Sequence, residues 1–157
     1  DAANEFEAEN PTHPRGDYCL YMKGLIHFDK APNWLEKLFR VDLTERPPRE
    51  TMLAFSDFQE LIRRFPDSEY VPDARDRMIF LRNRLATYEN HVARYYIERE
   101  AFVAAINRAK YAIEHYPGAP ALEESLSLLA EAYDRLGITD LAEDARRVQE
   151  TTFGENL

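Results

Sequence analysis

Residues 84–117 read RLATYENHVARYYIEREAFVAAINRAKYAIEHYP, and this stretch decides the fold. It contains Tyr96 and Ala105, and 37 residues further along the chain stand Tyr133 and Ala142. A small residue, an aromatic residue, a second small residue and a closing proline at these offsets match the tetratricopeptide (TPR) pattern. Antiparallel helices can approach closely where an alanine faces an aromatic ring. The repeat therefore predicts stacked helical hairpins, which commonly bind partners.

Prolines indicate where several helices end. Pro11, Pro66 and Pro117 each follow an amphipathic stretch, and proline cannot continue a helix. Between the first two prolines we expect helices over 17–28, with Gly24 at a close-packing point, and over 51–65. The residues between these helices form an insertion that ends in prolines, and ordered loops of this length are often functional.

Downstream, one long helix is predicted over residues 72–100, with Pro72 in its first turn. Its apolar residues recur at alternating steps of four and three, which defines a continuous seam: Ala74, Met78, Leu81, Leu85, Tyr88, Val92 and Tyr95. The seam favours packing within the chain, and a coiled-coil dimer is the alternative. Further helices are expected over 101–116, over 122–136 with Gly137 as its C-terminal cap, and over 140–150 with Thr139 as its N-terminal cap.

These elements predict an all-α fold, a right-handed superhelical solenoid of antiparallel TPR helix pairs. The whole of residues 1–157 is expected to form a single stack. Within it, residues 1–10 would be the tail of a preceding repeat, and 14–66 a repeat with an inserted loop at 29–49. Residues 72–117 would hold the long helix and a second repeat, and 120–151 the terminal repeat. The register predicts that Ala93, Ala105, Ala130 and Ala142 are buried at helix crossings.

Composition limits the possible functions. The net charge of −9 argues against a nucleic-acid partner, and Cys19, the single cysteine, excludes an intrachain disulfide. The four histidines lack metal-ligand spacing, and no glycine-rich phosphate loop or nucleophile elbow is present. The sequence therefore predicts no enzyme, no cofactor and no metal site.

What remains is a set of aromatic and arginine residues. Residues 61–120 carry 10 Lys and Arg against 8 Asp and Glu, so this segment is net positive. Within it, Tyr95 with Arg94, Arg99 and Arg108 is expected to bind an acidic partner surface, because Tyr and Arg dominate interface energetics. The alternative is that these arginines only pair with carboxylates on their own helices, namely Glu89, Glu98 and Glu114.

A set of short motifs lies at residues 10–14, 17–18, 21–25, 39–42, 46–47, 54–58, 65–68, 84–89 and 92–99. Together they resemble the BamD (ComL/YfiO) family, the tetratricopeptide lipoproteins of the outer-membrane β-barrel assembly machinery. The similarity runs along nearly the whole chain and includes the inserted loop. One departure is Glu100, at a turn where the resemblance implies glycine; another is Glu114, where it implies a basic residue.

The resemblance implies a C-terminal fragment of a periplasmic protein on the inner face of the outer membrane of a Gram-negative bacterium. Its membrane attachment would be an N-terminal lipid anchor that this chain lacks. The C-terminal repeats would bind a POTRA domain of BamA, with other barrel-assembly lipoproteins as further partners. The alternative function is a module that captures unfolded outer-membrane protein precursors. The inserted loop is expected to supply a second contact through Trp34, Phe39, Arg40 and Asp42.

Overall fold

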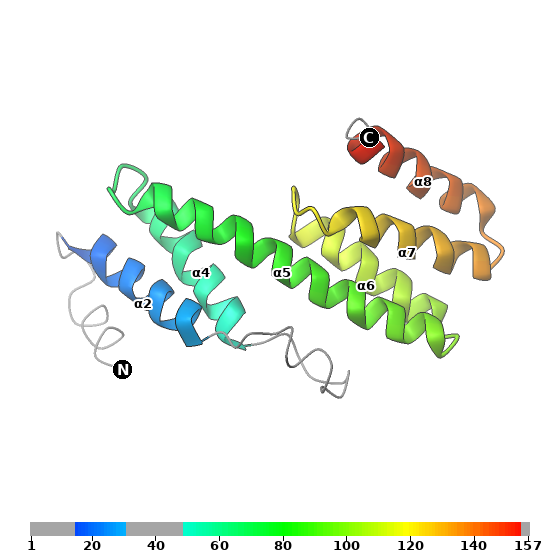
Figure 1. Cartoon of the computed structure of the whole chain (residues 1–157), viewed down its shortest axis with the longest axis horizontal. Coiled ribbons are helices and arrows are strands. Elements are labelled where there is room, and N and C mark those ends of the chain that lie inside the picture. The colour runs from blue at the N-terminus through cyan, green and yellow to red at the C-terminus, as the bar shows by residue number, and fades with distance from the viewer. Residues whose placement is uncertain (1–14, 31–48, 155–157) are drawn as a thin grey trace. The chain divides into compact units, whose positions relative to one another are not determined.

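The structure is a computed structural model, and it describes residues 15–30 and 49–154. All the secondary-structure elements in this part of the chain are helices, so the predicted all-α class is confirmed (Figure 1). By internal contacts the chain divides after Leu81 into two compact units. The helices are α2 (Gly16–Lys30), α4 (Arg49–Arg64), α5 (Val71–Glu98), α6 (Phe102–His115), α7 (Leu122–Arg135) and α8 (Thr139–Phe153).

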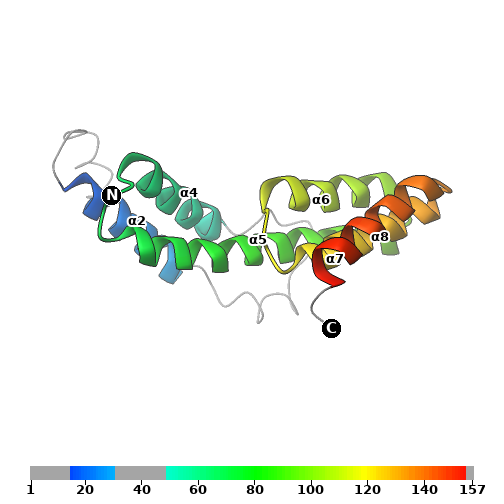
Figure 2. The same cartoon turned by 90° about the horizontal axis from the view of Figure 1, so that it is seen from above.

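In the first unit, α2 and α4 pack side by side in opposite directions (Figures 1 and 2). Their shared core contains Leu20, Phe58 and Leu61, together with residues from the first part of α5. Gly24 of α2 lies directly against the ring of Phe58, as its predicted role at a close-packing point requires. A β-carbon placed on Gly24 would lie 2.5 Å from Phe58 Cε1, a distance that real side chains do not adopt.

In the second unit, α6, α7 and α8 follow one another as antiparallel helices beside the last part of α5 (Figures 1 and 2). Ala93, Ala105, Ala130 and Ala142 are all buried in its core, and Tyr96 packs against them. The repeat register predicted from the sequence is therefore confirmed. Small side chains at these positions allow the helix backbones to approach each other.

The long helix predicted over residues 72–100 is present as the 28-residue α5. Most of its apolar seam is buried: Ala74 and Leu81 belong to the first unit's core, and Leu85 and Val92 are buried in the second unit. Tyr88 and Tyr95 of the seam are half-buried. The seam is thus covered within the chain, as favoured over a coiled-coil dimer. No helix in residues 15–30 and 49–154 combines the length and apolar character of a membrane span.

Two turns of the second unit share one geometry. Gly137 follows α7 with φ of 74°, and the Ile138 N–H donates to the Tyr133 carbonyl at 3.0 Å, so the predicted glycine cap is confirmed. At the end of α5, Glu100 has φ of 59°, and the Ala101 N–H donates to the Tyr96 carbonyl at 2.9 Å. Among the described residues, Glu100 is the one non-glycine residue with positive φ.

The predicted cap of the last helix is wrong. Thr139 is the first residue of α8, the N-cap is Ile138, and no side chain bonds the free N–H groups there. The reason is the tight turn at Gly137. It leaves Ile138 as the N-cap, so the helix begins one residue earlier than predicted from Thr139. The Ala142 N–H accordingly donates to the Ile138 carbonyl at 3.2 Å.

Candidate partner-binding site

The strongest feature of the candidate site is an ion pair between α5 and α6. Glu89 of α5 is 1% exposed, and Arg108 of α6 donates from Nη1 to its Oε2 over 3.2 Å. The arginine side chain itself remains 42% exposed. One end of the guanidinium is thus held by a buried carboxylate, while the rest faces solvent.

Glu89 lies in an environment that disfavours its charge. Burial raises the pKa of the Glu89 carboxyl, and the charges of Arg108 and His115 partly oppose that effect. Burial also raises the pKa of the neighbouring Tyr116 hydroxyl, with smaller contributions from Tyr111 and Glu89. The charged form of the carboxyl therefore depends on Arg108 for compensation.

Tyr95 and Arg99 form a second contact at the end of α5. The Arg99 guanidinium lies 4.4 Å from the centre of the Tyr95 ring, within cation–π range. Tyr95 also meets Tyr96 edge to face, with ring centres 5.7 Å apart. The pair leaves Arg99 exposed and its guanidinium charge available to an acidic group.

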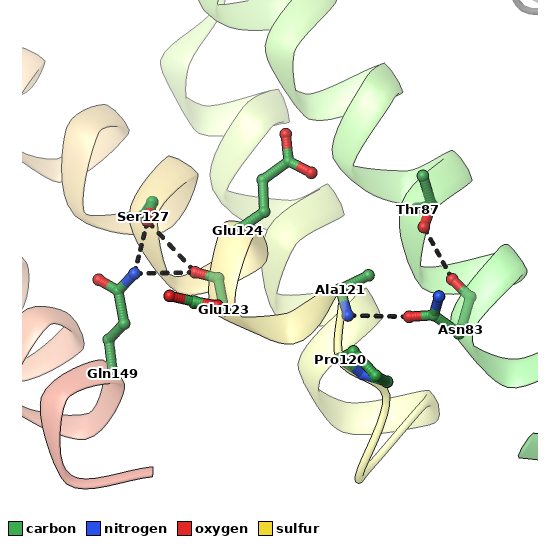
Figure 3. A pocket seen from close by; sticks show the side chains of 8 residues that line it. All are labelled: Asn83, Thr87, Pro120, Ala121, Glu123, Glu124, Ser127 and Gln149. Atoms are coloured by element: carbon green, nitrogen blue, oxygen red, sulfur yellow. Dashed lines mark hydrogen bonds between the residues drawn. The ribbon is translucent and has the colours of Figure 1, made fainter. Parts of the chain in front are cut away.

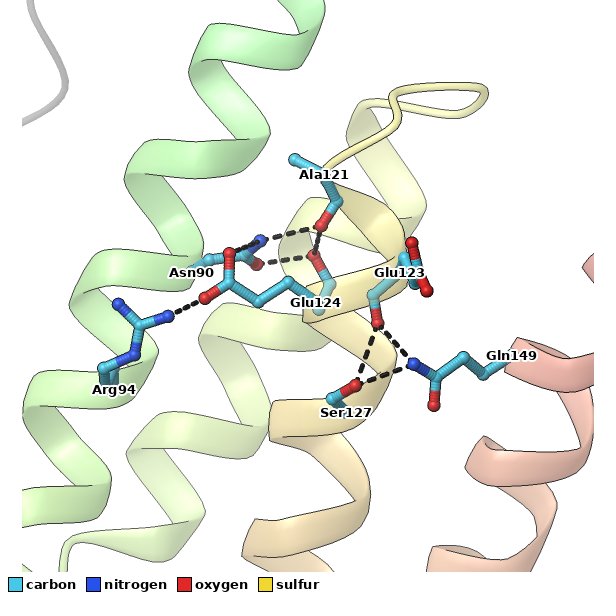
Figure 4. A network of polar contacts seen from close by, with 8 residues as sticks. Asn90, Arg94, Ala121, Glu123, Glu124, Ser127 and Gln149 are labelled. Atoms are coloured by element: carbon cyan, nitrogen blue, oxygen red, sulfur yellow. Dashed lines mark hydrogen bonds and ion pairs between the residues drawn. The ribbon is translucent and has the colours of Figure 1, made fainter. Parts of the chain in front are cut away.

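Arg94 is directed elsewhere. It forms an ion pair with Glu124 of α7, which also accepts a 3.3 Å hydrogen bond from the Asn90 amide (Figure 4). Arg94 lies within α5, whereas Arg99 is the first residue after the helix ends at Glu98. The structure therefore joins Tyr95 with Arg99 and places Arg94 and Arg108 in two other contacts.

Pairing within one helix, the alternative raised by the sequence, is not what the structure shows for Arg94 and Arg108. Each of these arginines pairs with a carboxylate of a different helix, at Glu124 and Glu89 respectively. The predicted second contact loop lies outside the described residues; its four members are Trp34, Phe39, Arg40 and Asp42.

The sequence reasoning missed a buried polar network that fixes the start of α7. Asn90 is 1% exposed; its Nδ2 donates to the Ala121 carbonyl at 2.7 Å, and its Oδ1 accepts from the Ser125 hydroxyl at 2.5 Å (Figure 4). Asn83 accepts from the Ala121 N–H at 2.9 Å. The signal in the sequence was a pair of asparagines, Asn83 and Asn90, one heptad apart. That spacing places both on the side of α5 that faces α7.

A polar pocket of about 490 Å³ opens beside this network (Figure 3). The side-chain amide of Gln149 in α8 crosses to α7 and donates to the Ser127 hydroxyl at 2.7 Å and to the Glu123 carbonyl at 3.2 Å. The lining residues come from α5, α7, α8 and the α6–α7 turn; they are Asn83, Thr87, Pro120, Ala121, Glu123, Glu124, Ser127 and Gln149.

Neither region has the geometry of a metal centre. Within residues 15–30 and 49–154, no group of three or more His, Cys, Asp or Glu side chains is placed to hold a metal ion. The side chains of these two regions can recognise a partner through guanidinium groups, tyrosine rings and side-chain amides.

The chain is similar to known proteins along most of its length. Residues 1–148 match the YfiO family model, described as an outer membrane lipoprotein. The outer membrane protein assembly factor BamD of Vibrio cholerae is 41% identical over 145 residues, which cover 92% of this chain and 60% of the relative. BamD of Neisseria meningitidis is 43% identical over 152 residues, covering 97% and 57%.

BamD of Pasteurella multocida is 36% identical over 155 residues, covering 99% of this chain and 60% of the relative. The chain thus spans less than two thirds of the length of these relatives. The match nevertheless extends along nearly all of the chain, through both helical units. The chain belongs to the YfiO family of outer membrane lipoproteins, the family of the BamD assembly factors.

Proposed function

We propose that this chain is a non-enzymatic scaffold of the outer-membrane β-barrel assembly complex, on the periplasmic side of the outer membrane of a Gram-negative bacterium. Its C-terminal TPR repeats bind a periplasmic POTRA domain of BamA. Membership of the YfiO family and the assembly-factor names of its relatives support the setting. The stacked helical hairpins support a binding role, because such folds present extended surfaces to partners.

The observation that carries the proposal is the state of Arg108. Its guanidinium is fixed at one end by Glu89 and 42% exposed, so it can form a forked bond with a carboxylate of the partner. Arg99 and Tyr95 add an exposed cation and an aromatic surface at the end of α5. Arg94 contributes less, because its ion pair with Glu124 must be broken or shared before a partner can use it.

A pair of charge-removing variants tests the proposal. Arg108→Gln should weaken binding to a purified BamA POTRA fragment about tenfold, which corresponds to ~1.4 kcal/mol. Lys110→Gln is the matched control: it removes the same charge from an exposed side chain two residues along α6, on the opposite face of the helix. Isothermal titration calorimetry should show the control within twofold of the unchanged chain. Equal affinities for both variants would place the interface elsewhere.

The alternative, capture of unfolded outer-membrane protein precursors, has one observation in its favour. The polar pocket of α5, α7 and α8 offers amide and carboxylate groups of the kind that bind extended peptide backbone. Glu123→Lys would reverse an exposed charge on its rim. Loss of binding to a precursor peptide, with POTRA binding intact, would favour this function over the scaffold.

A further inference from the structure

Glu89 lies where no partner can touch it, and it nevertheless bears on the partner site. Glu89 is 1% exposed, so it cannot contact another protein directly. Its carboxylate accepts the Arg108 Nη1–H at 3.2 Å. Among the described residues, it is the one carboxylate in the buried class.

A carboxylate in such a place is costly, because removal from water disfavours its charge. The titratable and charged groups that act on it come from α6 and the turn after it: Arg108, His115 and Tyr116. An apolar residue or a glutamine of similar volume would fill the same space at lower cost. Stability of the fold therefore gives no reason for a carboxylate at this position.

The effect of Glu89 on the geometry of Arg108 does give a reason for a carboxylate at this position. A free arginine on a helix surface samples many rotamers and loses that freedom when a partner binds it. Glu89 restricts the guanidinium before binding, and the Arg108 side chain remains 42% exposed. Restricting a side chain in its bound pose raises affinity by reducing the entropy lost on association.

We propose that Glu89 is a positioning residue for partner recognition: from inside the second unit it fixes Arg108 in the pose in which an acidic surface meets it. This inference rests on the proposed function, since it assigns Arg108 to the partner interface. The inference goes beyond the proposed function because it places a determinant of affinity at a residue that lies beneath the surface.

A double-mutant cycle with the full chain and a purified BamA POTRA fragment tests this. Glu89→Gln keeps size and an acceptor oxygen but removes the charge that orients Arg108. It should weaken binding about three- to tenfold, with the circular dichroism spectrum unchanged. In the Arg108→Gln background, Glu89→Gln should have no further effect on affinity.

The outcomes separate the two ideas. If Arg108→Gln weakens binding and Glu89→Gln does not, the positioning role is wrong and the proposed function stands. If Glu89→Gln weakens binding equally in both backgrounds, its effect is structural and the positioning role is wrong. If Arg108→Gln has no effect, both the proposed function and this inference fail.

A second measurement decides the matter even if Glu89→Gln alters the fold. Side-chain ¹⁵N relaxation should show the Arg108 Nε–H of the unbound chain to be ordered on the nanosecond timescale. Arg147 is the comparison, because it is 70% exposed and pairs with Asp144 one helical turn away. An Arg108 side chain as mobile as Arg147 would overturn the inference.

Discussion

The α-carbon of Gly24 faces the ring of Phe58 so closely that no side chain fits between α2 and α4. Gly24→Ala should therefore force the two helices apart or push Phe58 out of its rotamer, and lower the free energy of unfolding by about 1–3 kcal/mol. Gly154→Ala is the control, since no atom lies within 4 Å of a β-carbon there. Urea titration of both variants measures the difference. Equal midpoints would show that the α2–α4 contact is looser than described.

The turn after α5 carries a residue poorly suited to its backbone. Glu100 has φ of 59°, which costs an L-residue about 1–2 kcal/mol, whereas glycine adopts it freely. Because glycine also gains freedom in the unfolded chain, Glu100→Gly should stabilise the fold by a net ~0.5–1 kcal/mol.

The reverse exchange at the matching turn provides the control. Gly137 has φ of 74° with open space around it, so Gly137→Ala should destabilise by about 1 kcal/mol through backbone strain alone. Thermal unfolding of the two variants should shift in opposite directions. A lower melting temperature for Glu100→Gly would mean that the Glu100 side chain itself stabilises the turn.

Ala105 tests the repeat register. It is 1% exposed within the second unit's core, so Ala105→Leu should overpack the crossing and cost about 1–3 kcal/mol. Val103→Leu, at a position 62% exposed on the same helix, should leave stability nearly unchanged. The denaturant midpoints of the two variants report the contrast, and an unchanged midpoint for Ala105→Leu would refute the register.

The raised pKa of Glu89 predicts a pH dependence of stability. In the unfolded chain the carboxyl loses its proton near its usual pKa of 4.5, and in the folded chain it does so at higher pH. In that window the folded state holds more protons, so this residue's contribution to stability falls as pH rises through the folded pKa.

Glu89→Gln removes that slope, because glutamine does not titrate. Relative to the variant, the unchanged chain should lose stability as the pH rises above 4.5 through the higher pKa of the folded state, and Glu89→Gln should be as stable or more stable once the carboxyl is ionised. Chemical unfolding at a series of pH values gives the comparison. Parallel pH profiles would show that the carboxyl is ionised equally in both states.

Much of the fold could be predicted because it depends on local patterns. The alternating steps along α5 and the alanines 37 residues apart reflect helix geometry, which the sequence records directly. Gly24 and Gly137 were identified for the same reason: each satisfies a steric demand that few residues can meet. Thr139 was misjudged because the turn at Gly137, and not the threonine, determines where α8 begins.

The site was less accessible to such reasoning. Arg108 was identified from residue type, but the alternative paired it with a carboxylate of its own helix, whereas the carboxylate it reaches is Glu89, which is buried on α5. Which carboxylate an arginine reaches depends on how two helices pack, and helix periodicity does not specify that. Asn90 was missed because its partners are a backbone carbonyl and a serine on α7, more than thirty residues away in sequence.

The pair of asparagines that holds Ala121 has a consequence for how far this repeat array is modular. Ala121 precedes α7 without a side-chain cap of its own, and Asn83 and Asn90 of α5 bond its N–H and its carbonyl instead. The first turn of the terminal hairpin is therefore fixed by hydrogen bonds from the preceding repeat. If α7 and α8 were transplanted or expressed alone, they would lose these hydrogen bonds. The minimal transferable module of this array therefore runs from Asn83 through α8.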